Sequence, residues 1–301
     1  MEGERIGLEY SLFPGCLPSA REFSCEVSAR KVFEALNVEL HDVEDFTCCM
    51  PACLVHSFDY VTGLALTSRN LCVADEFDRD ILTLCVSCYG NLWRAKKLMS
   101  ENGELRLEVN ELLASVNRAY QGKANIKHSV TALYEDIGIE SLKKNVSRTL
   151  KGIKAAPFYG CHMIRPKEYL SFDDTEFPEK LDKLIEATGA TSVMHRERTG
   201  CCIGCGSFFG GVAEEAALRL SVDILESAQE AEADCIVVTC PYCFLQIEMG
   251  QLLFKRRTGE LYNLPILHYT ELLGLSLGFE PKELGMDLHK IDATPILERI
   301  K

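Results

Sequence analysis

The chain has 301 residues, of which 47% are hydrophobic and 26% charged, and its formal net charge is −13. This composition is typical of a folded globular protein, and the acidic balance argues against nucleic acid and anionic membrane surfaces as partners. The apolar runs are shorter than the roughly 20 residues that span a bilayer, and the acidic N-terminus is unlike a secretory signal. We therefore expect a cytoplasmic protein without membrane insertion.

The first predicted elements are a strand and a helix around the first cysteine. The apolar run 7–13 predicts a strand that delivers Cys16 to a loop. Residues 19–37 predict a helix, because apolar residues recur there at helical spacing. Ser19 and Glu22 match a capping box at its start.

The remaining elements alternate in the same way along the chain. Strands are predicted at 80–85, 156–159 and 234–240, and each ends at or just before a cysteine. The segments 89–99 and 244–254 have the pattern of helices and follow two of these strands. Alternating strands and helices predict an α/β fold, in which ligand sites lie at the carboxyl ends of strands.

Ten of the fifteen cysteines form a unit that occurs twice, with the spacings C-x31-CC-x35-C-x-x-C and C-x39-CC-x37-C-x-x-C. The first unit consists of Cys16, Cys48, Cys49, Cys85 and Cys88, and the second of Cys161, Cys201, Cys202, Cys240 and Cys243. Repetition in the same order indicates a tandem duplication. We therefore predict two pseudo-symmetric domains, 1–150 and 151–301, each a small layered unit of strands and helices.

Patterned cysteines in a long chain without a secretory signal are more typical of metal binding or catalysis than of disulfides. Zinc takes four ligands, commonly from two C-x-x-C-like knuckles, and each unit supplies only one. A redox dithiol also needs one C-x-x-C and leaves the other three cysteines without a role. An iron–sulfur cluster suits an adjacent pair, because diverging neighbours can reach different irons. The pattern favours iron–sulfur over zinc or a dithiol, and all three remain open at this point.

The two units, together with "FYGCHMIRP" around Cys161, resemble the tandem cysteine-rich (CCG) domain family, most closely the B-type subunit of heterodisulfide reductase from methanogenic archaea. The resemblance extends from Tyr10 to about Leu275. It implies two noncubane [4Fe–4S] clusters, each bound by the five cysteines of one unit. It also implies reduction of the coenzyme M–coenzyme B heterodisulfide to two thiols in methanogenesis. The alternative is an electron-transfer or scaffold subunit of a related oxidoreductase in succinate, glycolate, lactate or sulfur metabolism.

Partners and further site residues are expected on the same basis. No flavin or nicotinamide motif is visible, so the resemblance implies electron delivery by the C-type ferredoxin subunit of heterodisulfide reductase and by a flavin-containing protein like its A-type subunit. His162 follows Cys161 and is the candidate proton donor, since an imidazole can exchange a proton near neutral pH. Arg165 and Lys167 are the candidates for binding the sulfonate and phosphate groups of the substrate.

Some residues depart from the family pattern. The glycine that often follows the adjacent pair is Met50 in the first half and Ile203 in the second. Cys53 and Cys205 lie close to the pairs, and we expect them to surround a cluster rather than to bind it.

Other cysteines and histidines are expected to have structural roles. Cys25, Cys72 and Cys235 lie in apolar segments and are predicted to be buried in the core. His128 and His268 occupy corresponding positions in the two halves, which favours a role in the fold over a role in one reaction.

Overall fold

Each half of the chain forms one parallel sheet of four strands. A computed structural model describes residues 7–50, 59–204 and 213–300. The strand orders are β2-β1-β3-β4 and β6-β5-β7-β8, and every pair is parallel. The strands are β1 (Glu9–Phe13), β2 (Glu39–Asp42), β3 (Ile81–Thr83), β4 (Ile126–His128), β5 (Lys154–Phe158), β6 (Thr191–Ser192), β7 (Cys235–Val238) and β8 (Ile266–His268). The fold is α/β, as predicted.

Helices connect the strands in both halves. In the first half these are α1 (Cys16–Ala20), α2 (Phe23–Ala35), α4 (Tyr60–Phe77), α5 (Val86–Glu101), α6 (Gly103–Ala114), α7 (Ser129–Ala132), the π-helical turn η1 (Leu133–Ile137) and α8 (Ile139–Asn145). In the second half they are α9 (Cys161–Ile164), α10 (Lys180–Ala187), α11 (Glu214–Glu230), α12 (Pro241–Thr258), α13 (Tyr269–Leu277), the 3-10 turns η3 (Pro281–Leu284) and η4 (Met286–Leu288), and α14 (Thr294–Leu297).

The strand order places a topological switch point in the middle of each sheet. From β1 the chain moves outward to β2, then returns across the sheet to β3, which pairs with β1 on its other side. The second half repeats this path with β5, β6 and β7. Parallel α/β sheets bind ligands at such a point, beyond the carboxyl ends of the two strands that flank it. The lone cysteine and the C-x-x-C of each half follow these two strands.

The prediction for residues 19–37 was partly wrong. The segment contains two helices, because residues 16–20 form the separate short helix α1 and α2 begins at Phe23. Ser19 lies in α1, where its hydroxyl donates to the Gly15 carbonyl at 3.3 Å. Glu22 precedes α2 without a capping bond from its side chain. The turn that carries Cys16 is thus itself helical, and the predicted capping box of Ser19 and Glu22 does not form.

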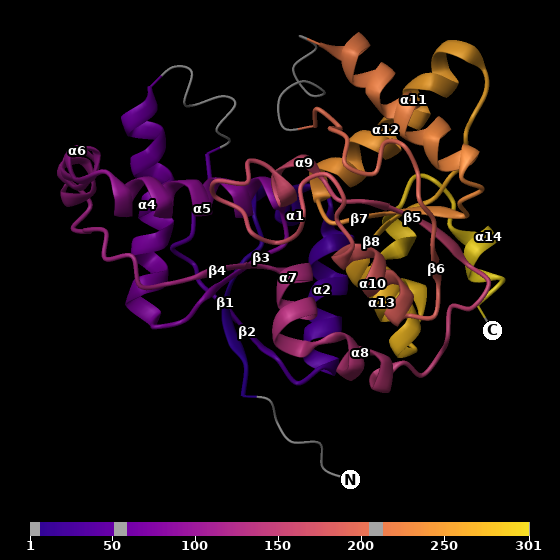
Figure 1. The fold of residues 1–301 in the computed structure, drawn as a ribbon, viewed down its shortest axis with the longest axis horizontal. Helices are drawn as coiled ribbons and strands as arrows, with labels where there is room; N and C mark the ends of the chain where they lie inside the picture. Colours follow the sequence, from indigo (N-terminus) through magenta and orange to yellow (C-terminus); the bar gives the residue numbers. More distant parts are fainter. Residues whose placement is uncertain (1–6, 51–58, 205–212, 301) are drawn as a thin grey trace.

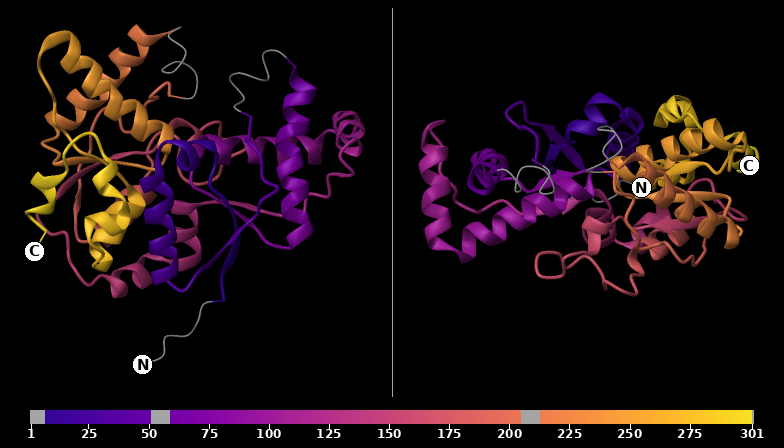
Figure 2. Two further views of the ribbon diagram at one scale, coloured as in Figure 1. Left: turned by 180° about the vertical axis from the view of Figure 1, so that it is seen from behind. Right: turned by 90° about the horizontal axis from the view of Figure 1, so that it is seen from above.

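The two halves pack directly against each other. Helix α2 of the first half lies beside α13 of the second, and α1 contacts α12 while α5 contacts α9. Figures 1 and 2 show α2 and α13 next to each other where the halves meet, from the front and from behind. Because α1 corresponds to α9 and α5 to α12, the α1–α12 and α5–α9 contacts are equivalent and are related by an approximate twofold axis. Within the described ranges, no helix combines the length and apolarity needed to cross a membrane.

Candidate metal centre

The predicted ligand cysteines lie at the switch points of the two sheets. Cys16 is the first residue of α1, and Cys85 immediately precedes α5 as its N-cap. Cys161 and Cys240 hold the same positions at α9 and α12. These two long helices begin at Val86 and Pro241, earlier than predicted, so the second cysteine of each C-x-x-C lies in the first helical turn. Free N–H groups and the positive end of the helix dipole favour thiolates there.

Thiol–thiol contacts connect nearly all of these cysteines into one series. Neighbours interact in the order Cys16, Cys48, Cys49, Cys88, Cys85, Cys240, Cys243 and Cys202, and Cys161 pairs with Cys201. The structure thus brings together the members of each unit, although they come from three separate segments of each half.

The two sets of thiols adjoin at the approximate twofold axis. The Sγ atoms of Cys85 and Cys240, which are equivalent residues of the two halves, lie 3.8 Å apart. Within the second set, the Cys202 and Cys243 sulfurs are 3.3 Å apart, and those of Cys161 and Cys201 3.8 Å. The sites are therefore neighbours rather than features of opposite faces.

Burial follows the same pattern in both halves. The lone cysteine and the first cysteine of the adjacent pair are exposed or half-buried, whereas the other members are at most 4% exposed. The outer cysteines are Cys16, Cys48, Cys161 and Cys201, and the inner ones are Cys49, Cys85, Cys88, Cys202, Cys240 and Cys243. Each set therefore has a buried base and an edge open to solvent.

A glycine precedes each lone cysteine and leaves room for the sulfurs. Gly15 and Gly160 have φ of +85° and +76°, a backbone conformation that residues with a Cβ rarely adopt. A Cβ on Gly15 would lie 3.1 Å from the Cys88 sulfur, and one on Gly160 would lie 3.6 Å from the Cys243 sulfur. The repeated Gly-Cys step signalled these positions in the sequence, but their role is evident only from the fold.

The residue after each adjacent pair has the backbone conformation of a glycine. Met50 and Ile203 have φ of +52° and +56°. Left-handed conformations are rare for ordinary residues and a clear outlier for a β-branched one. The residue after each pair is thus left-handed although it is not a glycine.

Buried polar side chains of α4 and α5 hold the first pair in place. The Thr67 hydroxyl donates to the Cys49 carbonyl at 2.9 Å, and the Asn70 amide donates to the Cys48 carbonyl at 3.3 Å. The Asn91 amide lies 3.6 Å from the Cys49 sulfur. None of these residues was predicted, because polar positions within a helix carry no sequence signal of their own.

Hydrogen bonds between thiols make some of them more acidic. A hydrogen bond from Cys161 lowers the pKa of Cys201 to about 6. Hydrogen bonds from Cys48 and Cys88 lower the pKa of Cys49 well below its ordinary value. Hydrogen bonds of the same kind raise the pKa of partner thiols, among them Cys85, Cys88 and Cys243, so the thiols of each set differ in acidity.

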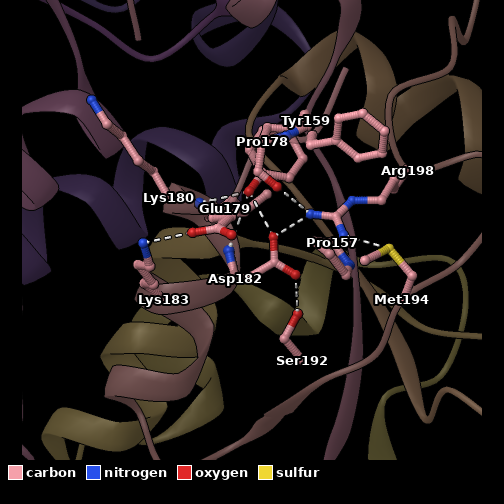
Figure 3. Close-up of polar contacts among 12 residues, drawn as sticks. Pro157, Tyr159, Pro178, Glu179, Lys180, Asp182, Lys183, Ser192, Met194 and Arg198 are labelled. Carbon is pink, nitrogen blue, oxygen red and sulfur yellow. Dashed lines mark hydrogen bonds and ion pairs between the residues drawn. The ribbon is translucent and has the colours of Figure 1, made fainter. Parts of the chain in front are cut away.

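A polar cluster in the second half joins the chain segments that lead to Cys161 and to Cys201 (Figure 3). The hydroxyl of Tyr159, two residues before Cys161, donates to the Asp182 carboxylate at 2.6 Å. The Arg198 guanidinium, three residues before Cys201, bonds the same carboxylate and lies 5.4 Å from the Tyr159 ring. One buried network therefore positions the chain before both cysteines.

The other predicted site residues lie around the second thiol set. The ring of His162 is mostly buried against α5, and a Cβ on Gly90 would be 3.4 Å from its Cβ. Burial lowers the pKa of His162, so its imidazole is less readily protonated at neutral pH than expected. Arg165 donates to the carbonyls of Thr199 and Thr175 at 3.0 and 2.9 Å, which anchors nearby loops. Lys167 is exposed.

The cysteines outside the two units include three that are buried, as predicted. Cys25, Cys72 and Cys235 are at most 4% exposed. The expectations for Cys53 and Cys205 fall outside the described residues.

His128 and His268 are also buried, and they end β4 and β8. Each packs on the aromatic residue that follows a C-x-x-C: Tyr89 with ring centroids 5.9 Å apart and Phe244 with 4.7 Å. These contacts fit the structural role expected of both histidines.

The donor set fits an iron–sulfur group. Each half supplies five thiols over a buried base, and glycines leave space beside them. Within the described part of the chain, no three His, Cys, Asp or Glu side chains are placed to hold a single metal ion.

Comparison with known families identifies this arrangement. A model of the cysteine-rich domain (CCG) matches residues 10–93 and 155–248, which contain all ten clustered cysteines. The chain belongs to the CCG family. The two matched regions correspond to the two parallel sheets of this CCG protein, with their clustered cysteines.

Several relatives of this CCG protein are similar over nearly their whole length. The B subunit of the ferredoxin/F420H2-dependent CoB-CoM heterodisulfide reductase of Methanosarcina acetivorans is 37% identical over 96% of both chains. A protein of Archaeoglobus profundus that is named as similar to the B subunit of heterodisulfide reductase is 34% identical over 92% of this chain and 93% of the relative. The 8-methylmenaquinol:fumarate reductase membrane anchor subunit of Wolinella succinogenes is 31% identical over 96% and 99%.

A solved structure shares the fold. The crystal structure of a hypothetical protein from Helicobacter pylori matches 97% of this chain with a TM-score of 0.74 at 15% identity. The match spans about half, 53%, of that chain.

Proposed function

We propose that this chain is the iron–sulfur subunit of a heterodisulfide reductase, and that it reduces the coenzyme M–coenzyme B heterodisulfide to two thiols in methanogenesis. The observation that supports this most directly is the presence of two complete five-thiol sets that adjoin through the Cys85 and Cys240 sulfurs, 3.8 Å apart. A disulfide breaks into two sulfur fragments and takes up two electrons, which suits a pair of neighbouring redox sites. Relatives that carry this activity in their names support it further.

The reaction balances with two electrons and two protons. The S–S bond breaks, and each sulfur becomes a thiol after accepting one proton. Two [4Fe–4S] clusters of the noncubane type, one on each five-cysteine unit, would supply the electrons one at a time. We propose that they receive these electrons from a ferredoxin subunit like the C-type subunit of heterodisulfide reductase and from a flavin-containing protein like its A-type subunit.

The residues around the second site are proposed to handle protons and charge. His162 lies next to an outer cysteine, so its imidazole can pass a proton to a departing thiolate. Lys167 is exposed nearby and can attract the sulfonate or phosphate group, together with the part of the Arg165 guanidinium that faces solvent. His162→Gln is expected to retain iron and to slow turnover markedly.

A second candidate is an electron-transfer or scaffold subunit of a related oxidoreductase. The Wolinella relative favours it, because that protein is similar over 99% of its length and is named as part of a fumarate reductase. The two candidates differ in whether the chain itself cleaves a disulfide.

The deciding experiment is a disulfide-reduction assay of anaerobically purified protein with reduced methyl viologen as the artificial donor. Turnover of the coenzyme M–coenzyme B heterodisulfide supports the first candidate, whereas full iron and sulfide without turnover supports the second. Stoichiometric zinc without sulfide would refute both. Cys240→Ala should lose second-site iron and activity, and Cys25→Ala, a buried cysteine outside both units, should keep them at a cost of about 1 kcal/mol.

A further inference from the structure

One side chain of the second half reaches into the thiol set of the first. Tyr242 lies between Cys240 and Cys243, yet its hydroxyl oxygen is 3.8 Å from the sulfur of Cys16. This contact follows from the packing of α12 against α1, since the two residues are 226 positions apart in the chain. Tyr242 of the second half therefore contacts Cys16, an outer cysteine of the first thiol set.

The equivalent contact is missing on the other side of the twofold axis. The residue at the corresponding position of the first C-x-x-C is Ser87. Its side chain is buried, and its hydroxyl has no hydrogen-bond partner among the residues that the structure describes. A serine is too short to reach across the interface as a tyrosine does. The two thiol sets thus differ at this position, although their cysteines match.

The backbone of Tyr242 contacts the second site, whereas its side chain contacts the first. Its carbonyl packs closely on Gly204, beside the second adjacent pair, where an added Cβ would lie 2.9 Å from the oxygen. An ordinary phenol keeps its proton at neutral pH, so the hydroxyl of Tyr242, 3.8 Å from the Cys16 sulfur, can donate to it. The hydroxyl is thus placed over a sulfur that is itself open to solvent.

We propose that Tyr242 is a positioning residue that donates a hydrogen bond to the Cys16 sulfur and makes the two redox sites unequal. A donor at a thiolate ligand stabilises the more negative, reduced state, and such bonds are one of the ways in which proteins set cluster potentials. Through this bond the first site accepts an electron more readily than it would without the Tyr242 hydroxyl. This inference rests on the proposed function, in which both thiol sets hold iron–sulfur clusters.

The test is a redox titration of the full chain, followed by electron paramagnetic resonance. Signals are assigned to the two sites with Cys16→Ser and Cys161→Ser, each of which alters one ligand. In Tyr242→Phe, which removes one oxygen and keeps the ring, we expect the ratio of reduced to oxidised first site at a fixed potential to fall about fivefold, the effect of one weak hydrogen bond. The second site should stay unchanged, and Ser87→Ala should shift neither.

The outcomes separate this inference from the proposed function. Parent protein without iron and sulfide would refute the proposed function. Two clusters in the parent, with no shift or an equal shift at both sites in Tyr242→Phe, would refute the role of Tyr242 alone. Loss of first-site iron from Tyr242→Phe would also overturn it, because the hydroxyl would then be needed for assembly.

Discussion

Gly160→Ala tests whether the turn before Cys161 needs a glycine, both for its backbone conformation and for the space beside the second thiol set. The backbone of Gly160 has φ of +76° and ψ of +131°, and holding an alanine there costs about 1–3 kcal/mol. The added methyl would also lie 3.2 Å from Val86 of the other half and 3.6 Å from the Cys243 sulfur. Overpacking of a buried contact costs a further ~1–3 kcal/mol. We expect a total loss of about 2–6 kcal/mol in the free energy of unfolding, together with loss of second-site iron.

Gly138→Ala is the matched control for the backbone strain. Gly138 has φ of +83° and ψ of +147°, close to the values at Gly160, but no atom lies within 4 Å of an added Cβ. It should lose only the ~1–3 kcal/mol of strain and keep all of its iron. Anaerobic denaturant unfolding and iron content per chain measure both effects. Equal destabilisation of the two variants, with full iron in each, would refute the reasoning from contact with the site.

Two further variants test strain and buried charge. Burial and the nearby Glu248 carboxylate raise the pKa of Glu22 from 4.5 to about 7, so stability should fall as pH rises through that range. The free energy of unfolding of the parent, measured at pH 5 and pH 8, should fall by up to about 3 kcal/mol between the two because of Glu22. Glu22→Gln should lose this difference, and the exposed control Glu34→Gln should keep it. An unchanged pH dependence in Glu22→Gln would contradict the prediction. Ile203→Gly should stay within about 1 kcal/mol of the parent, because relief of left-handed strain offsets lost packing, and a loss above about 2 kcal/mol would argue against that strain.

Local pattern was sufficient to predict the central strands and the helices that follow them. The segments 80–85 and 234–240 are apolar because they are buried on both faces of a parallel sheet, and such runs are readable without the fold. The edge strands β2, β4, β6 and β8 were not predicted, because all four are short, and β2 and β6 are also largely polar. The duplicated cysteines marked the candidate site by spacing alone.

The amino-acid sequence by itself determined which cysteines make up each set, because the duplicated spacing marks the same five positions in each half. Only the tertiary structure decided how the two sets meet. The contact of Cys85 with Cys240 joins residues 155 positions apart, and that of Cys16 with Tyr242 joins residues 226 apart. Such contacts depend on the docking of two separately patterned halves through α2 and α13. Periodicity within one half carries no information about that docking, because the docking depends on the complementary shapes of two packed surfaces.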